Sequence, residues 1–136
     1  MDIRLRTSDE TSALDLLDLR YEPGGPAFAG IFVFKSNGYG AKLALWMHVS
    51  EIRSLIDRLR VMDTRLQGHA ELWPAGDFHR VRLQLTRTGA VEVSVELGVP
   101  TSNYLMARFT TDQTCLSPLI DDLERLMLTA GSDTTS

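Results

Sequence analysis

The chain has little cysteine and no long apolar run, and each shortage excludes a class of protein. The single cysteine, Cys115, cannot form an internal disulfide, so the fold does not require an oxidising compartment. No segment approaches the ~18 apolar residues that a transmembrane helix needs. Asp2 and Arg4 interrupt any early apolar run, so we expect no signal peptide. These absences predict a cytoplasmic protein with no membrane association.

Sequence motifs for catalysis, cofactors and metals are also missing. The sequence contains no Gly-rich phosphate loop, no dinucleotide fingerprint and no Gly-x-Ser-x-Gly nucleophile turn. The possible metal ligands are His48, His69, His79, Asp77 and Cys115, but no two of the histidines have the short spacing of metal ligands and the lone cysteine has no partner nearby. We therefore expect no cofactor, no metal and no enzymatic activity.

Strong positive charge is absent as well. The net charge is −4, from 14 basic and 18 acidic residues, whereas nucleic-acid binders are usually basic. The arginines of residues 53–65 are interrupted by Asp57 and Asp63 and have no aromatic platform beside them, so we expect no nucleic-acid partner. What is present is an ordinary apolar content of 43%, in a chain of 136 residues that predicts a single globular domain.

Residues 66–98 alternate between apolar and polar side chains, which is typical of strands with one buried face. A three-residue turn at 87–89, with Gly89 in the left-handed position, would pair Leu85 with Val91. A four-residue turn at 74–77 would pair Trp73 with Phe78. This register predicts an outward row of charges, Glu71–Arg80–Glu96, that helps to fix the strand pairing.

The first half of the chain predicts further strands. Asn37-Gly38 between apolar runs is a strong hairpin signal and would pair Phe34 with Ala41 and Phe32 with Leu43. Residues 3–6 alternate and suggest a first strand. Residues 14–21 fit neither the strand nor the helix period cleanly, and we favour a strand because a Pro-Gly-Gly-Pro segment ends them so soon.

Two amphipathic helices complete the predicted elements. Ser50 is a suitable N-cap for a helix whose apolar positions recur at helical spacing until about residues 63–65. A second helix, capped at Thr114 or Ser117, carries an apolar stripe from Leu116 to Met127. The predicted fold is α+β: a mainly antiparallel meander sheet with both helices packed on one face. Residues 1–130 form the domain and residues 131–136 a flexible tail.

The sheet face away from the helices is where we expect a partner to bind. Aromatic anchors and an acidic rim there would suit a protein interface. The candidate residues are Trp46, Trp73, Phe78, Glu71, Glu92 and Glu96.

Two alternatives stay open. Cys115 lies at a predicted helix N-terminus, which would lower its pKa, so a small enzyme could use it as a nucleophile with one of the three histidines as base. A homodimer could instead bury the aromatic patch between two copies of the chain.

The order of elements resembles a group of small bacterial proteins named for immunity to the WapI contact-dependent toxin. The resemblance covers most of residues 28–128 and rests on hydrophobic pattern and Gly89; related uncharacterised bacterial families share it. It is carried by the strand ending Leu43-Ala44-Leu45, the helix from Ser50 to Leu59, the strand ending Glu71-Leu72-Trp73, residues 89–95 and the helix from Leu116 to Leu126. It implies a soluble, non-enzymatic protein that binds and neutralises a toxin made by the same cell. No toxin-contacting residue is matched.

Overall fold

The computed structural model describes residues 1–7, 11–74, 79–98 and 104–134, and its strands form two four-stranded antiparallel sheets. The first sheet has the order β1 (Ile3–Arg6), β2 (Ser12–Glu22), β3 (Ala27–Ser36), β4 (Tyr39–His48). The second has the order β5 (His69–Leu72), β6 (His79–Leu85), β7 (Ala90–Gly98), β8 (Tyr104–Asp112). Each sheet is followed by a helix: α1 (Val49–Arg65) after the first, and α2 (Leu116–Thr134), entered through the short 3₁₀ turn η1 (Gln113–Cys115), after the second.

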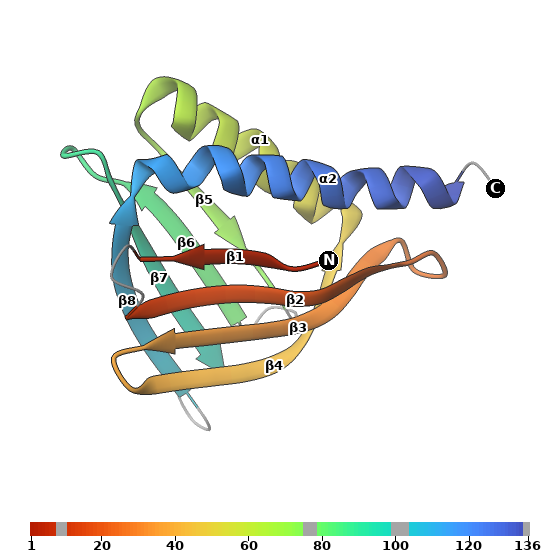
Figure 1. Cartoon of the computed structure of the whole chain (residues 1–136), viewed down its shortest axis with the longest axis horizontal. Coiled ribbons are helices and arrows are strands. Elements are labelled where there is room, and N and C mark those ends of the chain that lie inside the picture. The colour runs from red at the N-terminus through yellow and green to blue at the C-terminus, as the bar shows by residue number, and fades with distance from the viewer. Residues whose placement is uncertain (8–10, 75–78, 99–103, 135–136) are drawn as a thin grey trace.

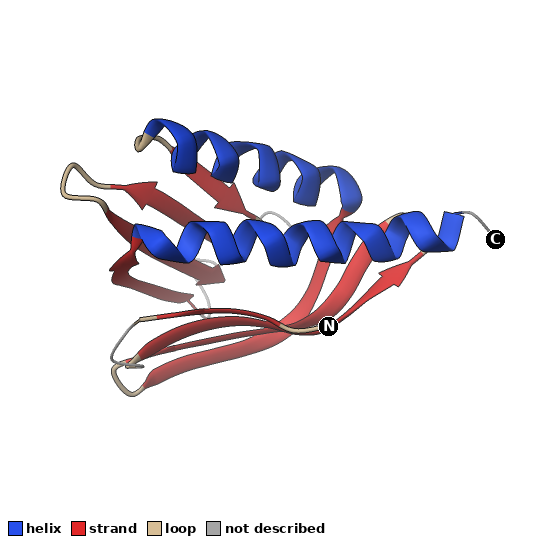
Figure 2. Cartoon of the chain, turned by 45° about the horizontal axis from the view of Figure 1, so that its top comes forward, coloured by secondary structure: helices blue, strands red, loops and turns tan. Residues whose placement is uncertain are grey.

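The predicted α+β class, mainly antiparallel with two helices, is confirmed, although the strands divide between two sheets. Figure 1 shows the strands of the two sheets crossing at a large angle, with both helices on one side of the molecule. Figure 2 shows the helices running side by side over the space between the sheets. The helices therefore close a core whose other walls are the inner faces of the two sheets.

One continuous apolar core joins the sheets and helices. Phe34 of the first sheet stacks on Phe109 of the second, with ring centroids 6.2 Å apart. Alternate side chains of the strands and one stripe of each helix are buried with them, because this arrangement removes the inner face of each sheet and the apolar stripe of each helix from water. Packing is close to complete: the cavity between Ile3, Leu55 and Leu123 has a volume of only about 30 Å³.

The strand predictions in the first half of the chain are confirmed. The β3–β4 hairpin turns at Asn37 and Gly38, both with positive φ, and pairs Phe34 with Ala41 and Phe32 with Leu43. Residues 3–6 and 14–21 both lie in strands. The irregular period of residues 14–21 has a local cause, since Asp18 has φ of 54° where the β2–β3 register shifts between Leu17 and Arg20.

In the second sheet one register prediction is confirmed and one is wrong. Gly89 has φ of +84°, and the β6–β7 hairpin pairs Leu85 with Val91 and Arg80 with Glu96. Glu71, however, pairs with Arg82 rather than Arg80. A shift of two residues leaves every side chain on its original face, so alternation could not distinguish the two registers. The predicted Trp73–Phe78 pair and turn at 74–77 involve residues outside the described ranges.

Both predicted helix caps are wrong by a few residues. His48, not Ser50, caps α1: the backbone N–H of Ser50 donates to His48 Nδ1 at 3.1 Å. Asp112, rather than Thr114 or Ser117, caps the turn before α2, because its carboxylate accepts from the Thr114 N–H at 3.0 Å. In each case a side chain at the end of the preceding strand reaches forward to the first free N–H groups. Helix α2 continues to Thr134, and the flexibility expected of residues 131–136 stays a prediction.

Candidate protein-binding surface

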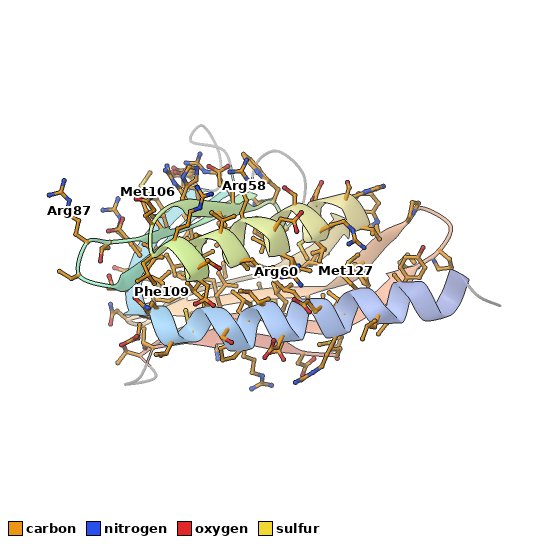
Figure 3. The ribbon with its side chains drawn as sticks, turned by 90° about the horizontal axis from the view of Figure 1, so that it is seen from above. Arg58, Arg60, Arg87, Met106, Phe109 and Met127 are labelled. Carbon is orange, nitrogen blue, oxygen red and sulfur yellow. The ribbon has the colours of Figure 1, made fainter. Side chains whose placement is uncertain are left out.

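The outward face of the second sheet carries a broad polar hollow of about 600 Å³. It is built by alternate residues of β6 and β7, whose intervening neighbours Val81, Val93 and Val95 are fully buried in the core, and by residues 106–108 of β8. Its lining is Arg80, Arg82, Gln84, Glu92, Ser94, Glu96, Met106, Ala107 and Arg108. Met106, which is 62% exposed, lies on this side of the sheet (Figure 3).

Ion pairs hold the three candidate glutamates of this face. Arg80 contacts Glu96 at 2.9 Å and Glu71 at 4.0 Å, and Arg108 contacts Glu92 at 3.6 Å. These side chains are partly exposed, so each pair contributes little to stability but orients both partners. The predicted row of Glu71, Arg80 and Glu96 is therefore present, with Glu71 as the diagonal neighbour of Arg80 rather than its direct partner.

Arg82 lies between these ion pairs and differs from Arg80 and Arg108 in its contacts. It faces Glu71 on β5 and Ser94 on β7, yet within the described part of the chain it makes no ion pair. Its Nε is buried and has no hydrogen-bond partner. The alternating pattern did not distinguish Arg82 from its neighbours, because the predicted register placed Arg80 opposite Glu71.

A groove of about 460 Å³ lies between the edge strand β5 and the first turns of α1. It is lined by Ser50, Glu51, Ser54, Arg58, His69, Glu71 and Trp73. A second hollow of about 490 Å³ continues along α1 and shares Ser54, Arg58 and His69 with the groove. Figure 3 shows Arg58 on the side of α1 away from α2, whereas Arg60 lies between the two helices. Because Glu71 lines the groove and contacts Arg80, the groove and the sheet hollow form one continuous surface.

A main-chain hydrogen bond holds Trp46 next to this surface. Its N–H donates to the carbonyl of Pro74 at 2.8 Å, which ties β4 of the first sheet to the segment that follows β5. The Trp46 side chain is 51% exposed, and Trp73 is half-buried in the groove. The fold thus brings the backbone of Trp46 into contact with Pro74, the residue after Trp73, and gathers Glu71, Glu92 and Glu96 on one sheet face. Phe78 lies outside the described residues.

The alternative in which Cys115 is a reactive nucleophile is not supported. Burial, opposed by a backbone hydrogen bond and reinforced by the nearby Asp112 carboxylate, raises the pKa of the Cys115 thiol to about 11. Desolvation disfavours the thiolate more than the helix start favours it. The thiol is therefore protonated at neutral pH, and a Cys115 nucleophile has no support.

The histidines occupy separate positions. His48 caps α1, His79 Nδ1 accepts a hydrogen bond from the Gly98 N–H at 3.1 Å, and His69 lines the groove beside β5. In the described ranges, no group of three or more His, Cys, Asp or Glu side chains could hold a metal ion. In the same ranges, no helix has both the length and the apolar character needed to cross a membrane.

The architecture, with two strand-rich units sharing one core, also occurs in solved structures. The Trypanosoma brucei MRP1/MRP2 structure has a TM-score of 0.58 at 6% identity, covering 100% of this chain and 87% of that one. WHY1 from Arabidopsis thaliana has a TM-score of 0.55 at 12% identity, covering 93% and 82%. Identities this low establish a common fold alone. A search of the curated proteins gives no match.

The sequence family is more specific than the fold. The model of the immunity protein WapI-like family matches residues 32–130, which include α1, the whole second sheet and most of α2. The chain belongs to this family, and the resemblance drawn from the hydrophobic pattern is confirmed.

Proposed function

We propose that the chain is an immunity protein that binds a toxin domain made by the same bacterial cell and neutralises it in the cytoplasm without catalysis. Membership of the immunity protein WapI-like family is the observation that carries this proposal. The raised pKa of Cys115 agrees with it, because the best candidate nucleophile is protonated at neutral pH.

The binding surface in this proposal is the sheet hollow together with the groove beside β5. Hollows of this size accept side chains of a protein partner, and partly exposed tryptophans are frequent anchors in such interfaces. The proposed anchors are Trp46, Trp73 and Phe78. Glu71, Glu92 and Glu96 would form a rim whose geometry is set by Arg80 and Arg108. A rigid rim lowers the entropic cost of binding, because its side chains are already ordered.

The test is protection against, and binding to, a toxin domain from the bacterium that makes this chain. Co-expression should restore growth, and the purified proteins should form a stable complex in calorimetry. Trp73→Ala should weaken binding by about 30-fold, the loss expected of an interface hot spot, with little change in thermal unfolding. Tyr39→Ala, at the exposed β3–β4 turn and 71% exposed, is the matched control and should bind normally.

Failure of the wild-type chain to protect cells or bind the toxin domain would reject the immunity function. Protection with a Trp73→Ala variant that binds as tightly as wild type would retain the function but place the interface elsewhere.

A further inference from the structure

Arg82 occupies the middle of the second sheet's outward face. Its cross-strand neighbours are Glu71 on β5 and Ser94 on β7, and Ser94 in turn pairs with Arg108 on β8. The surrounding carboxylates are already engaged: Glu71 and Glu96 with Arg80, and Glu92 with Arg108. Arg82 is therefore the guanidinium of this face that the described residues leave without an ion pair.

The side chain is also partly withdrawn from solvent. Arg82 as a whole is partly buried, and its Nε is fully covered without a hydrogen-bond partner. A buried polar group without a partner lowers stability, so such groups are uncommon unless a ligand satisfies them. Arg82 is one of the residues that line the hollow of about 600 Å³, from which an incoming group can approach it.

The charge of the hollow selects the incoming group. Its lining contains three arginines (Arg80, Arg82, Arg108) and two glutamates (Glu92, Glu96), which leaves one excess positive charge in a chain of net charge −4. A carboxylate matches this excess and can accept two parallel N–H bonds from one guanidinium. A second cation would be repelled, and a neutral carbonyl would leave the excess charge uncompensated.

We propose that Arg82 is a binding site for a carboxylate, supplied by an aspartate or glutamate side chain that the toxin domain inserts into the sheet hollow. This inference rests on the proposed immunity function and names the chemistry of the contact. Arg80 and Arg108 act as positioning residues: their existing pairs keep Glu71, Glu96 and Glu92 away from Arg82 and so leave it available.

The experiment measures the dissociation constant of the toxin-domain complex for wild type, Arg82→Gln, Arg82→Lys and Arg87→Gln. Arg87 is a solvent-exposed arginine in the β6–β7 turn and does not line the hollow; Figure 3 shows it at the left-hand end of the molecule. Arg82→Gln should weaken binding about 30-fold or more. Arg82→Lys, which keeps the charge but not the bidentate geometry, should lie between Arg82→Gln and wild type. Arg87→Gln should bind like wild type.

Thermal unfolding of each variant separates binding from folding. Because Arg82 makes no ion pair in the described chain, Arg82→Gln should unfold at or slightly above the wild-type temperature. If Arg82→Gln fails to fold, Arg82→Lys decides the question, since it retains the apolar stem and the charge. A titration with free glutamate at ~10 mM, a concentration far above the dissociation constants of typical protein interfaces, tests whether a small carboxylate occupies Arg82 in the presence of the toxin domain.

Weakened binding by both Arg82 variants, with Arg87→Gln unchanged, would support the carboxylate site. Wild-type affinity in both Arg82 variants would overturn it while leaving the immunity function intact. Binding of free glutamate at Arg82 that leaves the toxin domain bound would overturn the assignment to a side chain of the toxin domain. Absence of any complex with wild type would reject the immunity function and this inference together.

Discussion

The contact between Phe34 and Phe109 joins the two sheets within their shared core. Phe34 is 0% exposed and Phe109 is 7% exposed, and their rings stack with centroids 6.2 Å apart and planes inclined by 26°. Truncating a buried phenylalanine to alanine costs about 3–5 kcal/mol, which is a large part of the ~5–15 kcal/mol that stabilises a domain. Phe34→Leu and Phe109→Leu are milder, and each should lower the free energy of unfolding by about 1–2 kcal/mol.

The two substitutions should not be additive. An aromatic pair contributes about 0.5–1.5 kcal/mol beyond its buried area, and the centroid separation here lies toward the long end of the favourable range. We therefore expect a coupling energy of about 0.5–1 kcal/mol in a double-mutant cycle. The assay is urea unfolding of the four proteins, followed in parallel by circular dichroism and tryptophan fluorescence.

Phe28→Leu provides the control, because Phe28 also lies on β3 but its ring contacts Tyr21, at 5.7 Å, instead of Phe109. Phe28→Leu combined with Phe109→Leu should be additive. If the Phe34→Leu and Phe109→Leu effects are also additive, or if circular dichroism and tryptophan fluorescence report separate unfolding transitions, the two sheets do not share one cooperative core.

Four further predictions follow from local features. His48→Ala should lower the free energy of unfolding by about 1 kcal/mol in urea titrations because α1 loses its cap, whereas His48→Asp should restore it; equal stability of the two variants would contradict the capping role. Cys115 should react slowly with a disulfide reagent at neutral pH and faster as the pH rises toward about 11, and rapid labelling at pH 7 would refute this. Because the pKa of Cys115 in the folded chain lies above the unfolded value of 9.0, its contribution to stability is present below pH 9 and lost as the pH rises toward 11. Gly89→Ala should destabilise by about 1 kcal/mol, because φ is +84° and a Cβ would lie 3.0 Å from the amide oxygen of Gln113; an unchanged melting temperature would argue against it. If a homodimer buries the exposed Trp46, sedimentation at micromolar concentration should give a dimer that Trp46→Ala dissociates, and a wild-type monomer would reject that alternative.

Local sequence signals determined much of the fold. Alternation marked the strands, Asn37-Gly38 and Gly89 set two hairpin registers, and apolar stripes at helical spacing located both helices. These features depend on residues close in the chain, whose backbone preferences and burial pattern are legible without the rest of the molecule. The family resemblance drawn from the same pattern is confirmed by the match over residues 32–130.

The tertiary structure decided the features that depend on distant residues. Alternation predicts that a strand has a buried face but not which sheet covers it, so the division into two sheets could not be read from the pattern. The β5–β6 register differed by two residues, because such a shift preserves every face and costs no burial. That shift places Arg82 opposite Glu71, while Arg80 retains the carboxylates. The sequence thus determined the composition of the outward face, and only long-range pairing decided which arginine on it is left for a partner.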